Sequence, residues 1–255
     1  MLGVASGEPA ADSVVLWTRL GALPLNADGQ GGMANADVVV DWQVSTTDTF
    51  AALVASGTVI ARYADAHSLH VVAGGLAPDA DYYYRFRAQG HLSPVGRTRT
   101  SPTTGTFGRD FTMAFASCAH NENGYYTAYR RMAEDRPDLV LHLGDYIYEG
   151  GVGSGVRQHV GAEIVSLADY RRRYALYKSD PDLQAAQQMA PWLVVPDDHE
   201  EGGGAWTRAS RHPRVASEEE AAEPGQETGD DVDHATKSCA KQAEERHCES
   251  PFIRC

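Results

Sequence analysis

The first hundred residues alternate short apolar runs with clusters of turn residues. Each run is rich in β-branched or aromatic residues, and they lie at 13–20, 36–47, 54–63, 68–76, 81–90 and 94–102. Short strands at this spacing predict an antiparallel β-sandwich, which we assign to residues 1–108. Within it, Leu76-Ala77-Pro78 followed by Tyr82 predicts a corner in which the tyrosine hydroxyl bonds to upstream backbone. We interpret Trp17 and the run Tyr82, Tyr83 and Tyr84 as core and corner residues, not as contacts to a ligand.

From Asp110 the periodicity changes. An apolar strand at 111–118, a helical pattern at 125–136 and a second apolar strand at 137–148 predict a βαβ unit. Two helices should follow, the second capped by Asp180 with Pro181 at its first position, and then a third buried strand at 191–195. The sequence therefore predicts a layered α/β unit over 109–204, with a boundary between the two units at 107–110.

Beyond Glu200 the apolar pattern fails. Residues 205–255 have no sustained period and are rich in Ala, Glu, Gly and Arg, so we expect a divergent, disordered tail. The abrupt change resembles translation in a shifted reading frame, which favours a truncated or frameshifted product. The alternative is a structural zinc site in the tail, although the spacing matches no standard finger: His234, Cys239, His247, Cys248 and Cys255.

Three predicted strands of the α/β unit end in residues that can bind metal. They are Cys118, then Asp145 with Tyr148, then Asp198 with His199. Because the carboxyl ends of parallel strands meet at one edge of a sheet, these side chains should lie together. Each signal alone is weak, since a strand-end cysteine is more often a packing residue. The string at 197–200, Asp-Asp-His-Glu, is stronger, because adjacent carboxylates at a buried strand end repel each other unless a cation is present.

These segments resemble a known family. Residues 3–20, 115–151, 167–195 and 197–200 are similar, in order and spacing, to PhoD-like alkaline phosphatases. The resemblance implies a two-domain α+β protein: a fibronectin-type-like antiparallel β-sandwich followed by the first half of an α/β metallophosphoesterase core. It also implies hydrolysis of phosphate monoesters and diesters.

The resemblance implies a site of Fe(III) and Ca²⁺. Carried over, the ferric ligands are Cys118, Tyr148 and a bridging Asp145, while Asp198 is the candidate calcium ligand. Soft thiolate and phenolate suit Fe(III), and carboxylates suit Ca²⁺. His199 would be catalytic, stabilising charge or supplying a proton. His120 is a weaker candidate, because Cys-x-His echoes the Asp-x-His of the wider superfamily; otherwise it is a solvated loop histidine.

The sequence departs from the family at two places. Pro196 replaces a usual tryptophan, and the Asn-rich stretch and later ligands expected after Glu200 are missing. We therefore expect this chain to bind metal weakly, to hydrolyse esters poorly and to leave apolar sheet faces bare. The alternative function is a non-catalytic truncated product in which the sandwich acts at most as an interaction module.

Charge and composition argue against some classes of binding partner. A formal net charge of −13 argues against a nucleic-acid surface, and no apolar run reaches the roughly 18 residues that span a bilayer. We expect a small phosphate ester as substrate and a monomer in solution. The family implies a secreted, periplasmic or cell-surface protein, although residues 1–20 do not read as a signal peptide.

Overall fold

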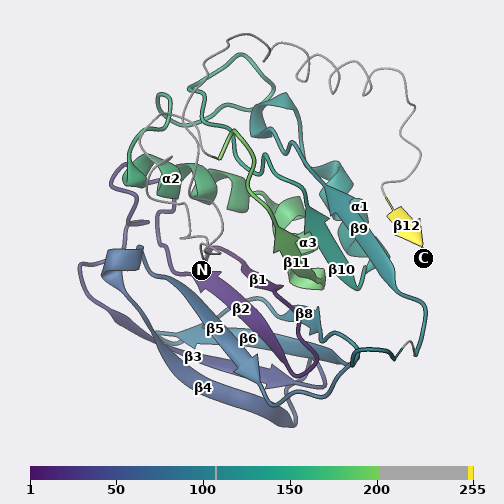
Figure 1. Ribbon diagram of the computed structural model, residues 1–255. Coiled ribbons are helices and arrows are strands. Elements are labelled where there is room, and N and C mark those ends of the chain that lie inside the picture. Colours follow the sequence, from purple (N-terminus) through teal and green to yellow (C-terminus); the bar gives the residue numbers. More distant parts are fainter. Residues whose placement is uncertain (107, 201–251, 255) are drawn as a thin grey trace, which may run out of the picture. The chain divides into compact units, whose positions relative to one another are not determined.

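Two β-sheets organise the part of the chain that the computed structural model describes, residues 1–106, 108–200 and 252–254 (Figure 1). The larger sheet has the order β12-β9-β10-β11-β1-β2-β5. Its strands are β1 (Val4–Gly7), β2 (Ser13–Arg19), β5 (Ser68–Gly74), β9 (Thr112–Ala116), β10 (Leu139–His142), β11 (Pro191–Val194) and β12 (Phe252–Arg254). The smaller sheet contains β3 (Val38–Ser45), β4 (Leu53–Ala61), β6 (Asp81–Ala88), β7 (His91–Leu92) and β8 (Gly96–Arg99).

The N-terminal strands form a sandwich, as their alternation predicts. One face of β1, β2 and β5 packs on the smaller sheet around fully buried residues such as Leu16 and Tyr84. The predicted corner is present, since the backbone N–H of Ala77 donates to the Tyr82 hydroxyl at 2.8 Å. Every strand predicted between residues 13 and 102 forms, whereas β1 lies before the first predicted run.

The predicted βαβ unit is confirmed. Strands β9 and β10 are parallel and are joined through helix α1 (Thr127–Asp135), and β11 continues the parallel order. Helix α2 (Leu167–Lys178) begins with a reciprocal capping box between Ser166 and Asp169. Helix α3 (Pro181–Met189) begins at the predicted Asp180 cap, whose side chain accepts from two backbone N–H groups. Short 3₁₀ turns lie at Tyr63–Asp65 and Asn121–Asn123.

The larger sheet is continuous from the sandwich into the α/β part. Strand β1 pairs with β2 on one side and, in parallel, with β11 on the other, where Ser6 is opposite Pro191 and Gly7 opposite Trp192. The described residues 1–200 accordingly belong to one compact unit. The division at 107–110 into two separately folding domains stays a prediction, and Phe107 lies outside the described residues.

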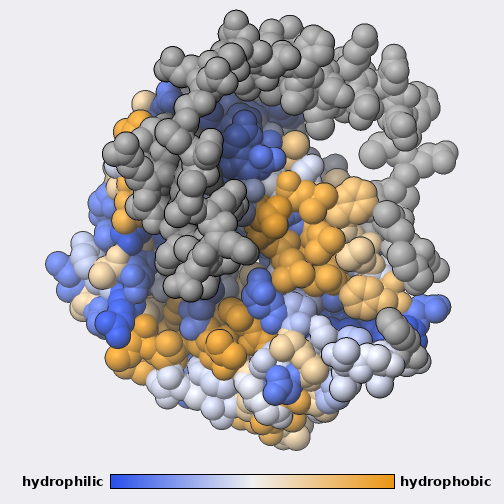
Figure 2. Space-filling model, viewed as in Figure 1, coloured by the Kyte–Doolittle hydropathy of each residue, from blue (hydrophilic) through white to orange (hydrophobic). Residues whose placement is uncertain are grey.

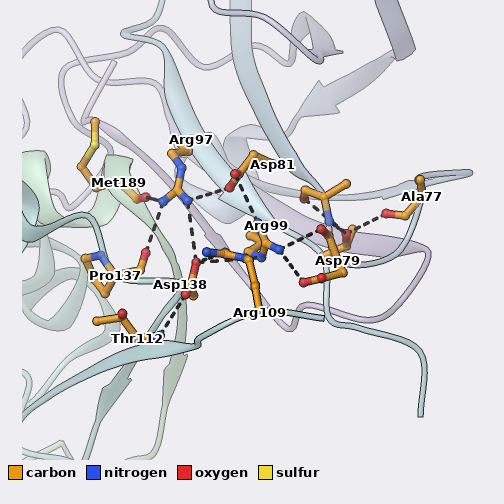
Figure 3. A network of polar contacts seen from close by, with 12 residues as sticks. Ala77, Asp79, Asp81, Arg97, Arg99, Arg109, Thr112, Pro137, Asp138 and Met189 are labelled. Carbon is orange, nitrogen blue, oxygen red and sulfur yellow. Dashed lines mark hydrogen bonds and ion pairs between the residues drawn. The ribbon is translucent and has the colours of Figure 1, made fainter. Parts of the chain in front are cut away.

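A buried polar network ties β8 to the α/β part (Figure 3). The Arg97 guanidinium donates to the backbone carbonyls of Pro137 and Met189, at 3.2 and 3.0 Å. Asp138 is 5 % exposed and accepts from the backbone of Thr112 at 2.9 Å. The remaining charged members are Asp79, Asp81, Arg99 and Arg109. Because buried charges are costly unless they are paired, this network fixes the α1–β10 connection against the sandwich.

Among the described residues, one face of the parallel strands is left bare. On the face toward α1 and α3, Ala114, Val140 and Trp192 are buried. On the opposite face, Leu141 lies between Phe115 and Leu193 in register, and Phe115 is 39 % exposed. Figure 2 shows apolar atoms gathered over these strands. In the described part of the chain, no element covers this face.

Candidate functional site

The loops that follow β9, β10 and β11 meet at the carboxyl edge of the larger sheet. The first two loops are tied together by backbone hydrogen bonds: Cys118 donates to the Gly144 carbonyl at 3.2 Å, and Ala119 donates to the Asp145 carbonyl at 2.9 Å. Both Cys118 and Asp145 have a positive φ, of 55° and 54°. Non-glycine residues adopt this conformation at a cost, and such strain concentrates at functional sites.

Asp145 is the centre of the site. It is 9 % exposed, and its Oδ2 accepts from the Cys118 thiol at 3.5 Å and from the Tyr148 hydroxyl at 3.2 Å. Its Oδ1 is buried and has no hydrogen-bond partner among the described residues. A buried carboxylate oxygen without a partner is costly, so this atom is left with coordinating capacity that the protein itself does not use.

The two groups that bond Asp145 are held in their neutral forms. Partial burial raises the pKa of the Cys118 thiol, and the Asp145 charge raises it further. Burial likewise raises the pKa of the Tyr148 phenol, with added contributions from Cys118 and Asp145. A cation at Asp145 would reverse this balance, because bound metal stabilises thiolate and phenolate.

The third loop adds Asp198 and His199. Ligand atoms of Asp145, Asp198 and His199 all lie within 4.8 Å of one another, and the His199 ring lies 4.0 Å from the Tyr148 ring, centroid to centroid. The structure therefore brings together all five residues singled out in the sequence. We call Cys118, Asp145, Tyr148, Asp198 and His199 the strand-end cluster.

Glu200 holds the loops that carry this cluster together. Its carboxylate accepts from the backbone N–H groups of Asp145, Tyr146 and Asp197, so it ties the loop after β11 to the loop after β10. The loops approach so closely that a Cβ on Gly144, whose φ is +95°, would lie 2.5 Å from the Asp197 Cβ. Only glycine fits there.

Comparisons with known proteins identify the family. The family model for the PhoD-like phosphatase matches residues 113–243, and that for the PhoD-like phosphatase N-terminal domain matches residues 1–102. Alkaline phosphatase D of Bacillus subtilis (strain 168) is 52 % identical over 205 residues. The chain belongs to the PhoD-like phosphatase family. A solved structure of PhoD, at 51 % identity, superimposes with a TM-score of 0.75 over 78 % of this chain.

The chain spans little more than a third of these PhoD relatives. The matches cover 35 % of the Bacillus protein and 38 % of the solved PhoD chain, against 78 % of this one. The family match extends to residue 243, past the predicted start of the tail at 205. Of the predicted tail, the structure describes only Phe252–Arg254, which form strand β12. The disorder expected for the rest of the tail, its reading-frame origin and the zinc alternative concern residues outside the described ones and stay predictions.

A second group of potential ligands lies beside the cluster: His120, Glu122 and His159. Glu122 Oε1 accepts from the backbone of Gly153 and His159, at 2.8 and 2.9 Å. His159 uses both ring nitrogens, Nδ1 with the Gly150 carbonyl at 3.0 Å and Nε2 with the Tyr177 hydroxyl at 2.9 Å. We call Glu122, His159 and Tyr177 the loop clamp, because these bonds hold the 150–160 loop in place.

His120 lies between the two groups. Its ring is 4.1 Å from Tyr148 and 5.5 Å from His159, and its Nδ1 is buried without a partner. It therefore contacts a candidate ligand through its ring, and it is not the solvated loop histidine of the alternative interpretation. Metal contact by His120 stays a prediction.

Proposed function

We propose that this chain carries part of the active site of a metal-dependent hydrolase of phosphate monoesters and diesters. The observation that supports the proposal is the buried, unpartnered Oδ1 of Asp145, beside an Oδ2 that accepts from a thiol and a phenol. A cation bound at Asp145 would replace the protons that the Cys118 thiol and the Tyr148 hydroxyl donate to it. Membership of the PhoD-like phosphatase family and the name of the Bacillus relative support the same reaction class.

The donor set fits iron and calcium. Cys118, Asp145 and Tyr148 offer sulfur, carboxylate and phenolate to Fe(III), and Asp198 offers an exposed carboxylate to Ca²⁺, with Asp145 between them. When bound, such ions supply Lewis-acid polarisation of the phosphoryl group and an activated oxygen nucleophile. The chain's own residues place these donors, and binding of a cation would displace the protons of the thiol and the phenol.

His199 is the proposed catalytic residue. Its ring lies against Tyr148 and beside Asp145 and Asp198, where it can donate to a phosphoryl oxygen or to the leaving group. Burial lowers the pKa of His199, but the hydrogen bond and charge of Glu149, with the charges of Asp145 and Asp198, outweigh it and raise that pKa overall. A raised pKa favours the protonated, donating form.

The finer architecture is also a proposal. We assign the sandwich to the fibronectin-type class and the α/β part to the first half of a metallophosphoesterase core. Since this chain spans 35–38 % of its relatives, we propose that residues 1–255 alone bind metal weakly and turn over esters poorly. The bare face over β9–β11 favours the second candidate, a non-catalytic product in which the sandwich is the stable interaction module.

Export is proposed from the family resemblance, as a secreted, periplasmic or cell-surface protein. No helix among the described residues is long and apolar enough to cross a membrane. We propose a small phosphate ester as substrate and a monomeric state, which the elution volume of the purified chain would test.

Hydrolysis of p-nitrophenyl phosphate and bis(p-nitrophenyl) phosphate separates the two candidate functions. The assay compares the 255-residue chain with iron and Ca²⁺, the same sample after chelation, and Asp145→Asn. Chelation-sensitive turnover that is lost in the variant supports the hydrolase. Absence of bound iron together with cooperative unfolding of the sandwich supports the non-catalytic product.

A further inference from the structure

Glu149 makes the only hydrogen bond to the His199 ring among the described residues. The Nδ1 atom of His199 lies 2.7 Å from Oε2 of Glu149. The Nε2 atom has no partner in this part of the chain. Because Glu149 directly follows Tyr148, the same short segment supplies a ring against the face of His199 and a carboxylate against its edge.

The backbone around Glu149 is held on both sides. The Arg173 guanidinium, 1 % exposed, donates to the Tyr148 carbonyl, and the Glu149 carbonyl accepts from the Ile164 backbone at 3.0 Å. The Glu149 carboxylate therefore extends toward His199 from a backbone segment that is fixed in place.

A carboxylate oxygen 2.7 Å from Nδ1 determines which ring nitrogen of His199 carries the proton. It requires a proton on Nδ1, so the neutral ring has its lone pair on Nε2 and the cationic ring has its second proton there. We propose that Glu149 is a positioning residue for His199, fixing its ring and tautomer so that Nε2 is the atom presented to the phosphoryl group. This inference rests on the proposed function for the role of His199.

The partial exposure of the His199 and Glu149 side chains distinguishes a positioning role from that of an ion pair that only stabilises the fold. The side chains of His199 and Glu149 are 33 % and 28 % exposed. Ion pairs with this access to water contribute little to stability. Removing Glu149 should therefore change the state of the His199 ring while leaving the unfolding midpoint almost unchanged.

The test is ¹⁵N-detected NMR of the histidine rings in the 255-residue chain, above the pH at which they titrate. In the unaltered chain, His199 should carry its proton on Nδ1. Glu149→Gln keeps an acceptor oxygen and should largely preserve that tautomer, whereas Glu149→Ala should shift the ring toward the mixture seen in free imidazole. His67 is the internal reference, since its Nε2 lies 2.8 Å from the Ala36 carbonyl and should not respond.

Glu134→Ala is the matched control, because it removes an exposed carboxylate paired with Arg131 on α1, away from the cluster. An unchanged His199 tautomer in Glu149→Ala would overturn the inference. In metal-loaded chain, Glu149→Ala should lower kcat about 10- to 100-fold with little change in KM, and Gln should recover part of the loss. A held tautomer with no effect of His199→Ala on turnover would instead count against the proposed function alone.

Discussion

The strand-end cluster and the loop clamp contain similar groups and lie side by side, yet their polar atoms are used differently. In the clamp, Glu122 accepts from two backbone N–H groups and both nitrogens of His159 are engaged. In the cluster, as far as the described residues go, one buried oxygen of Asp145 and Nε2 of His199 have no hydrogen-bond partner. Residue type alone therefore does not distinguish a candidate metal site from a group of residues that only holds a loop in place. The distinction lies in which lone pairs the fold itself uses.

Asp145→Asn should show the difference between the strand-end cluster and the loop clamp most strongly, because it should reduce metal affinity without reducing stability. The amide cannot supply a bridging carboxylate, so we expect at least a 100-fold loss of Co²⁺ or iron affinity, measured by competition with a chelator. The metal-free variant should be as stable to urea as the unaltered chain, or slightly more so, because a neutral amide replaces a buried negative charge. A variant that unfolds much more readily but binds metal normally would assign Asp145 to structure.

Metal affinity should rise with pH. The raised pKa values of Cys118 and Tyr148 keep both protonated in the metal-free chain, so binding as thiolate and phenolate releases both protons. Each released proton steepens the dependence by about tenfold in affinity per pH unit. Titration with Co²⁺ between pH 6 and 8 should therefore show a steeper slope in the unaltered chain than in Cys118→Ser. Equal slopes would mean that the thiol is not a ligand.

Glu122→Ala should affect stability and spare metal binding. It removes the acceptor of two backbone N–H groups, the buried one of His159 and the part-buried one of Gly153, which should cost about 1–3 kcal/mol in urea unfolding. Burial raises the pKa of Glu122, but the backbone bonds from His159 and Gly153 outweigh it and lower that pKa below 4.5. Its stabilisation is thus complete above pH 4.5 and is lost as the pH falls through the lowered folded value.

The control for this variant is metal affinity, which should change less than about threefold. A large loss of metal binding in Glu122→Ala, at conditions where the variant remains folded, would place the clamp inside the metal site and break the distinction between the two groups.

The sequence predicted the cluster because its signals are local. A buried strand followed at once by a polar side chain marks Cys118, Asp145 and Asp198, and parallel order brings such strand ends together. Glu122, Glu149 and Glu200 were not predicted as positioning residues. Apart from Asp197, which lies three residues before Glu200, the partners that these carboxylates accept from are 31 to 55 residues distant in sequence. No spacing rule connects a carboxylate with a remote backbone N–H or imidazole.

The fold shows the same contrast between features with local sequence signals and features that depend on distant contacts. The strands from 13 to 102 and the βαβ unit follow from periodicity and turn residues. Strand β1 has four residues, two of them half-buried, and its parallel partner β11 lies more than 180 residues away. Its sequence carries too little periodic signal, and its pairing depends on a contact that only the assembled sheet supplies. The continuity of the larger sheet was missed for that reason.

The central claim is that the strand-end cluster is a metal centre, and visible absorption of the iron-loaded chain tests it most directly. A tyrosinate bound to Fe(III) gives a charge-transfer band in the visible range. We predict that the unaltered chain and Glu122→Ala show this band and that Tyr148→Phe, with equal iron added, loses it. A band of equal position and intensity in Tyr148→Phe would contradict the assignment of Tyr148, and no bound iron in any of the three would contradict the site.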